Sequence, residues 1–237
     1  EAVRRIATEV EGPVTCALAR TTENDIRAAG EALAPGRRTR IHTFIATSDV
    51  HIRAKFKDFG RSMRARRKAI LRRAQEAVRH ARTYTDDVEF SAEDAGRTDL
   101  GFLREVVLAA VEAGATTINI PDTTGYCMPD EYAAMFETIR AALPDPDAVV
   151  LSTHCHDDLG LAVANSLAGV KAGARQVECT INGIGERAGN AALEEVVMAL
   201  RVRGDRYGID TRIHTPLLTE TSRMVSASSG FPVQPNK

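Results

Sequence analysis

Short runs of β-branched and apolar residues alternate along the chain with longer stretches in which apolar residues recur every three or four positions. The short runs predict buried strands, and the longer stretches predict amphipathic helices that pack on a sheet. Six strands are predicted, over residues 14–18, 40–47, 88–91, 116–120, 148–153 and 176–181. Because each strand is followed by a helical segment, the pattern indicates repeated βα units and a parallel sheet.

The predicted helices have their clearest apolar spacing over residues 62–83, 99–114, 130–143 and 158–173, with further helices over 1–10 and 216–228. A (β/α)8 barrel needs eight strands, and six are visible behind an N-terminal helix that no strand precedes. The pattern therefore allows a barrel that lacks its first strands or an open doubly wound sheet. No GxGxxG motif follows the first strand, which disfavours the dinucleotide-binding form of the open sheet.

The βα rhythm ends near Gly204, and the last residues, SSGFPVQPNK, contain one glycine and two prolines. Such residues are typical of a connecting segment. We therefore predict a partial catalytic barrel over residues 1–204 and the start of a C-terminal linker or subdomain over residues 205–237.

The composition is that of a soluble protein without a dominant charge. Hydrophobic residues make up 43% of the chain, and 31 Lys and Arg balance 32 Asp and Glu, for a net charge of -1. This balance argues against a surface built as a whole to bind nucleic acid or an anionic membrane. No apolar run is long enough for a membrane span, and the N-terminus lacks the apolar core of a signal peptide. Four widely separated cysteines fit neither a disulfide scaffold nor a zinc finger, so we expect a cytoplasmic location.

The strongest chemical signal lies at the end of the fifth predicted strand, in LSTHCHDDLG. His154 and His156 are two residues apart, so on an extended chain both imidazoles point to the same side. Asp157 and Asp158 follow directly. Two convergent imidazoles at a strand end, where barrels carry their active sites, indicate a divalent metal site with open coordination positions.

Other strand ends carry polar residues that could face the same site. His42 and Glu89 lie in the second and third predicted strands, and Thr123 follows the fourth. The last strand leads into NGIGERAGN, where glycines would let the backbone approach a ligand closely. This loop offers oxygen ligands and anion contacts through Asn182, Glu186, Arg187 and Asn190.

The segment from Thr153 to Leu200, together with RIHTFIATSDVH and INIPDTTGY, resembles the metal-dependent acyl-CoA barrel family. This family contains 2-isopropylmalate, homocitrate and citramalate synthases and hydroxymethylglutaryl-CoA lyase, and INGIGERAGNAALEE is most similar to the isopropylmalate branch. The resemblance covers nearly the whole chain. It implies a (β/α)8 TIM barrel, here lacking about the first two strands.

The resemblance also implies roles for individual residues. His154, His156 and Asn190 match metal-binding positions of the family. Residues that line its 2-oxo acid pocket are matched by His42, Glu89 and Thr123. Glu186 matches an acidic position of the glycine-rich loop, for which we expect a supporting or proton-transfer role.

The implied reaction joins acetyl-CoA to 3-methyl-2-oxobutanoate at a divalent Mn, Mg, Zn or Co ion, in a homodimer. The glycine-rich loop contains no cysteine, which favours the synthase direction over the lyase direction. A further aspartate ligand belongs to an Arg-Asp-Gly-Glu-Gln motif of the family, and this sequence has no such motif. We therefore expect this chain by itself to be inactive. Homocitrate synthase, citramalate synthase and a catalytically inactive fragment are the alternatives.

A third interpretation concerns residues 61–82, which hold eight Arg and one Lys against a single acid, Glu76. Clustered arginines can neutralise phosphates, so this helix could bind nucleic acid. Apolar residues at helical spacing instead favour an outer barrel helix with one buried face and one solvated basic face. We expect the second interpretation to hold.

Overall fold

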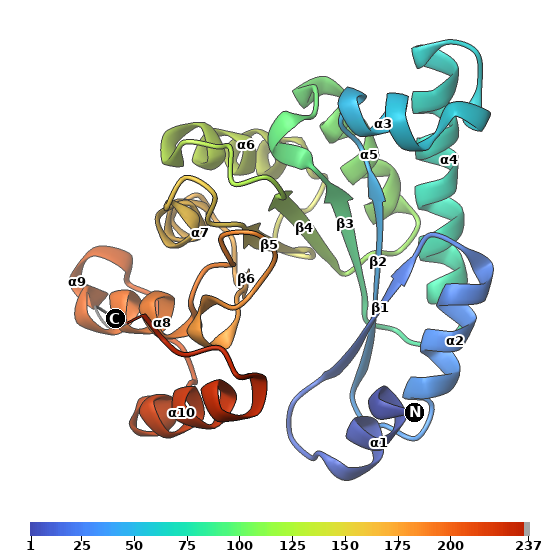
Figure 1. Ribbon diagram of the computed structural model, residues 1–237. Coiled ribbons are helices and arrows are strands. Elements are labelled where there is room, and N and C mark those ends of the chain that lie inside the picture. The colour runs from blue at the N-terminus through green and yellow to red at the C-terminus, as the bar shows by residue number, and fades with distance from the viewer. Residues whose placement is uncertain (235–237) are drawn as a thin grey trace.

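The computed structural model describes residues 1–234, and its six strands form one parallel sheet in chain order (Figure 1). All six predicted strands are confirmed. Their bounds are β1 Thr15–Arg20, β2 Thr39–Ala46, β3 Val88–Glu93, β4 Thr117–Asp122, β5 Val150–Cys155 and β6 Gln176–Glu178. Parallel neighbours in this order require a crossover after every strand, and the helices supply these crossovers.

The helices are α1 Ala2–Glu9, α2 Glu23–Leu33, α3 Asp49–Lys55, α4 Met63–Ala81, α5 Leu100–Glu112, α6 Pro129–Ala142, α7 Ala162–Lys171, α8 Leu193–Val202, α9 Gly204–Tyr207 and α10 Leu218–Ser229. Helices α2, α4, α5, α6 and α7 pack on the outer side of the curved sheet (Figure 1). The prediction of a helix from residue 158 is wrong at its start, because Asp157 Oδ1 accepts the Ala162 amide at 2.9 Å and the helix begins there. Residues 157–161 instead form a turn beside the end of β5.

Strand β1 shows that the sheet is an open part of a barrel. Within the described residues, β1 pairs only with β2 and β6 only with β5. Ala17 and Ala19 are buried, whereas the alternate residue Leu18 is 66% exposed on the inner face. An apolar inner-face residue with this exposure belongs to an unclosed barrel, since a closed barrel fills its interior with side chains. This confirms the predicted partial (β/α)8 fold.

Helix α4 confirms the expectation of an outer helix with one buried face. Its buried residues are Ile70, Ala74, Ala77, Val78 and Ala81. On the other face several arginines have acidic partners within the chain. Arg67 Nη2 lies 2.8 Å from Asp49 Oδ1.

The C-terminal segment is tied to the glycine-rich loop. Helices α9 and α10 contain no buried residue. Asn182 nevertheless donates through Nδ2 to the Ser222 carbonyl at 3.0 Å and accepts at Oδ1 from the Ser222 hydroxyl at 2.5 Å. No helix within residues 1–234 is both long and apolar enough to cross a membrane.

Gly169 allows α7 to pack closely on β5, and this contact can be tested. A Cβ atom at Gly169 would lie 2.5 Å from Cγ2 of the fully buried Thr153. We predict that Gly169→Ala lowers the free energy of unfolding by about 1–3 kcal/mol, although alanine favours helices. Gly204→Ala is the control, because a Cβ there meets nothing within 4 Å. Chemical denaturation of both variants in the protein that carries this chain would measure the difference. Equal stabilities would contradict the packing argument.

Candidate metal and substrate site

The carboxyl ends of the strands meet at one cavity of about 430 Å³. Side chains alternate along a strand, so every second residue of each strand faces the inside of the sheet. The cavity is lined by Leu18, His42, Phe44, Ser91, Glu93, Asn119, Pro121, Thr123, His154, His156, Glu178, Gly185, Glu186 and Asn190. Six of the seven sequence-predicted site residues therefore lie together. Glu89 is the exception.

His154 and His156 are adjacent at the end of β5, with ring centroids 4.9 Å apart. His154 Nδ1 lies 2.8 Å from Glu178 Oε2, and His156 Nδ1 lies 2.5 Å from the Thr123 carbonyl oxygen. Histidines that bind metals usually donate the other ring N–H to a carboxylate or a carbonyl, which leaves the remaining nitrogen as the ligand. Both rings match this pattern. Within residues 1–234 no hydrogen bond engages the Nε2 atom of either ring.

Asn190 adds an oxygen donor beside these rings. It pairs with His156 in an isolated antiparallel bridge. Its Nδ2 donates to the Ile184 carbonyl at 3.1 Å, whereas its Oδ1 is buried and has no hydrogen-bond partner in the described chain. A buried acceptor without a partner costs free energy, so a cation at this point would satisfy it. Two imidazole nitrogens and one amide oxygen form a donor set that fits a divalent metal ion.

Glu178 of β6 links His42 and His154, two of the three histidines that line the cavity. Its second carboxylate oxygen lies 3.4 Å from His42 Nδ1, and Asn119 Nδ2 donates to Oε2 at 3.2 Å. Burial would raise the pKa of Glu178, but the hydrogen bond from His154 and the charges of His42 and His154 together outweigh burial and lower it below its usual range. Glu178 is therefore an ionised acceptor that orients His154.

His42 is held on both sides of its ring. Its Nε2 lies 2.6 Å from the Ser91 hydroxyl, and Asn119 Nδ2 donates to the same oxygen at 2.8 Å. Burial lowers the pKa of His42 and outweighs the attraction of Glu178. With both nitrogens engaged in this way, the neutral imidazole is a fixed part of the cavity wall.

Glu89 lies beneath the cavity and does not line it. Its side chain accepts from Arg40 Nη1 at 3.0 Å and from Gln176 Nε2 at 2.7 Å, and the residue is 2% exposed. Burial and the nearby Glu178 carboxylate raise the pKa of Glu89 to about 8, against the lowering effect of Arg40. Glu89 and Glu93 both point inward from β3, and the one that reaches the cavity is Glu93.

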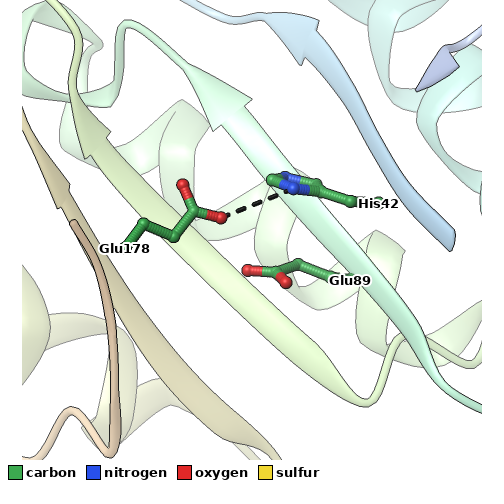
Figure 2. Close-up of side chains that lie close together, drawn as sticks. All are labelled: His42, Glu89 and Glu178. Atoms are coloured by element: carbon green, nitrogen blue, oxygen red, sulfur yellow. Dashed lines mark ion pairs between the residues drawn. The ribbon is translucent and has the colours of Figure 1, made fainter. Parts of the chain in front are cut away.

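His42, Glu89 and Glu178 converge from three strands (Figure 2), and one ligand atom from each lies within 4.8 Å of the others. This spacing would admit a metal ion. Both carboxylates already have partners in the chain, however, with Arg40 on Glu89 and the two histidines on Glu178. Glu89 thus lies in a buried polar layer under the cavity, whereas His42 and Glu178 line the cavity, adjacent to the donor set of His154, His156 and Asn190.

Thr123 and Glu186 lie at the rim of the cavity. The Thr123 hydroxyl accepts the Asp94 amide at 2.9 Å, which fixes the loop after β4. The Glu186 side chain is 78% exposed, and its Oε2 lies 3.5 Å from Arg187 Nη1. Neither Asp157 nor Asp158 lines the cavity, because Asp157 caps α7 and Asp158 pairs with Arg187.

Several residues of the site were not predicted. Glu178, Ser91, Glu93 and Asn119 occupy inward positions of buried strands, where a polar residue requires a partner. Side chains alternate along a strand, so taking every second residue from one that is known to face inward would have identified these positions. Glu178 stands two residues after Gln176 on one face of β6, and Glu93 stands four after Glu89 on one face of β3.

A curved parallel sheet with helices outside and polar groups at the strand ends is the architecture of (β/α)8 barrels. The family model described as HMGL-like matches residues 1–225, so the chain belongs to the HMGL-like family. Over all 237 residues it is 72% identical to 2-isopropylmalate synthase of Salinibacter ruber (strain M8) and 55% identical to that of Hydrogenovibrio crunogenus. The chain spans only 43% and 45% of the length of these two relatives.

A solved structure supports the fold. The HMG-CoA lyase of Acinetobacter baumannii, determined in complex with coenzyme A and 3-methylmalate, aligns with a TM-score of 0.75 at 20% identity. The alignment covers 97% of this chain and 74% of the lyase. A likeness at this identity concerns the arrangement of strands and helices.

The raised pKa of Glu89 makes stability depend on pH. The unfolded carboxyl loses its proton near its ordinary pKa, whereas the folded one retains it up to about pH 8. Between these values the folded state binds more protons, so Glu89 lowers stability as pH rises, by at most about 1.4 kcal/mol per pH unit. We predict a shallower decline between pH 5 and 8 for Glu89→Gln, measured by urea denaturation of the protein that carries this chain. Glu105→Gln, on the exposed face of α5, is the control and should retain the wild-type slope.

Proposed function

We propose that this chain carries the metal and 2-oxo acid site of an enzyme that condenses acetyl-CoA, 3-methyl-2-oxobutanoate and water to 2-isopropylmalate and CoA. The observation that carries the proposal is the convergence of His154, His156 and Asn190 on one cavity, each with a donor atom that no group within residues 1–234 engages. The identity of 72% to a protein named 2-isopropylmalate synthase supports the choice of reaction.

His154, His156 and Asn190 would hold a divalent Mn, Mg, Zn or Co ion through two Nε2 atoms and one Oδ1 atom. Such an ion would polarise a keto carbonyl and stabilise the alkoxide that forms when a carbon nucleophile attacks it. Glu178 and the Thr123 carbonyl accept the Nδ1 protons of the two rings and so keep their Nε2 lone pairs directed away from the strands.

The remaining cavity residues would position the acid. His42, fixed by Ser91 and Glu178, would contact the acid through its ring, and Thr123 would contact it from the rim of the cavity. Leu18, Phe44 and Pro121 line the same cavity and form its apolar wall. An apolar wall beside polar groups suits a branched alkyl chain attached to a carboxylate. Glu89 then contributes from beneath, by holding Arg40 and Gln176, and does not contact the acid.

We also propose the wider organisation of the protein. Residues 1–204 would be the partial catalytic barrel, and residues 205–237 would begin a connecting subdomain, of which the last three lie outside the described residues. The exposed helices α9 and α10 support this division. The active protein would be a homodimer that works in the cytoplasm and binds acetyl-CoA and a 2-oxo acid.

Thiol release from acetyl-CoA tests the reaction. With the protein that carries this chain and added Mn²⁺, we predict release with 3-methyl-2-oxobutanoate that exceeds release with pyruvate or 2-oxoglutarate. Removing the metal with a chelator should abolish it, and adding Mn²⁺ back should restore it. Preference for pyruvate or 2-oxoglutarate would favour citramalate or homocitrate synthase.

Residues 1–237 produced alone should give no turnover, since the exposed inner face of β1 marks an incomplete barrel. Measurable thiol release by this chain alone would refute this prediction.

Glu186 gives a second test. Its exposed carboxylate at the cavity rim can take up or deliver a proton, so Glu186→Gln should lower kcat by about 100-fold to 10,000-fold. The KM for the 2-oxo acid should change little, because Glu186 does not contact the donor set. Glu137→Gln, an exposed residue of α6, is the matched control. An unchanged kcat in Glu186→Gln would remove Glu186 from the proton-transfer steps.

A further inference from the structure

Arg187 occupies an unusual position in the glycine-rich loop. Its backbone is left-handed, with φ of 53°, a conformation that non-glycine residues rarely adopt. Strain of this kind persists only where surrounding contacts hold the residue in place. In Arg187 these contacts are made by the guanidinium group.

The guanidinium joins the ends of two strands. Nε and Nη2 bind the two oxygens of Asp158, at 2.7 and 2.8 Å. Nη2 also donates to the Thr123 carbonyl oxygen at 2.9 Å. Asp158 follows β5 and Thr123 follows β4, so one side chain connects both strand ends to the loop that carries Asn190.

Arg187 is not placed to bind a substrate anion, contrary to the anion contacts expected of this loop. It does not line the cavity. Its Nε and Nη2 are occupied by Asp158 and Thr123, and Nη1 faces Glu186 at 3.5 Å. The guanidinium of Arg187 therefore acts through the groups that it binds, Asp158 and the Thr123 carbonyl.

The group that Arg187 holds is the acceptor for His156. The Thr123 carbonyl has two lone pairs, and it receives Nη2 of Arg187 and Nδ1 of His156. Nη2 also lies 3.1 Å from Nδ1, so its two hydrogens are shared among Asp158, Thr123 and His156. Nδ1 lies 2.5 Å from the Thr123 carbonyl oxygen, which can only accept, so Nδ1 carries the hydrogen of this contact and Nε2 is the ring's lone-pair nitrogen.

We propose that Arg187 and Asp158 form a latch that holds His156 in the Nδ1–H tautomer and thereby sets the affinity of the site for a divalent metal ion. Arg187 is a positioning residue, since it acts through the Thr123 carbonyl and His156. The inference rests on the metal site of the proposed function and assigns the latch to residues outside the cavity.

The first experiment measures metal binding and needs no turnover. Calorimetric titration of the metal-free protein with Mn²⁺ should show a Kd about 10-fold to 100-fold weaker in Arg187→Met than in wild type. Arg187→Lys should recover part of the loss, because an ammonium can bind Asp158 but cannot make the forked contact. Arg201→Met is the matched control, since Arg201 has the same exposure and pairs with Asp210 at 3.1 Å, away from the site.

The latch also predicts that its two residues act as a unit. Asp158→Ala leaves a hydrogen of Nη2 free to be donated to His156 Nδ1, so it should weaken Mn²⁺ binding as Arg187→Met does. The double variant should bind no more weakly than the worse single variant. Additive losses, or a Kd in Arg187→Met equal to that of Arg201→Met, would overturn the proposal.

The second experiment reads the tautomer itself in the metal-free protein. Nitrogen-15 NMR of the histidine side chains should show the Nδ1–H form for His156 in wild type and a tautomer mixture in Asp158→Ala. An unchanged Nδ1–H form in Asp158→Ala would refute the latch. If wild type bound no Mn²⁺ at all, the metal site of the proposed function would fail, and the NMR result would still decide the tautomer claim.

Discussion

Parallel pairing of six strands in chain order is the constraint on which the rest of this structure depends. In a parallel sheet all strands run in the same direction, so their carboxyl ends lie on one side of the sheet. Residues far apart in sequence, such as His42 and His154, therefore face one cavity. The side-chain period of two then decides which residue of each strand enters the cavity. After each strand, a helix outside the sheet returns the chain to the side where the next strand begins.

Buried polar residues on the inner face of such a sheet need hydrogen-bond partners from the same chain. Two successive layers of side chains, around Glu89 and around Glu178, show these partners. Arg40 and Gln176 donate hydrogen bonds to Glu89 beneath the cavity. One layer nearer the strand ends, Glu178 receives His42 and His154. Unpaired charges at these depths would cost several kcal/mol, whereas paired ones hold imidazoles in fixed orientations. The lower layer therefore prepares the geometry of the upper one.

The interpretation of the sequence succeeded where the signal was local. The six strands, the buried face of α4 and the paired histidines of HxH follow from spacings of two, three and four residues. It failed where partners come from different strands. Glu89 was named and Glu93 was not, although both lie on the same face of β3 and Glu93 is the one that lines the cavity. Glu178 was not named, and Arg187 was named for an anion contact and not for its ion pair, since their partners lie 24 and 29 residues away, in His154 and Asp158.

The sequence by itself predicted the class of fold from hydrophobic periodicity and the residues of the proposed metal site from residue type and resemblance, because these are properties of short segments. Only the tertiary structure decided which nitrogen of each histidine stays available, since this depends on Glu178 from β6 and on the Thr123 carbonyl after β4. In the tertiary structure, Asn190 Oδ1 also has no hydrogen-bond partner within residues 1–234. Arg187 pairs with Asp158 and does not line the cavity. Hydrogen bonds between strand ends are set by sheet curvature and register, which no short segment of this sequence encodes.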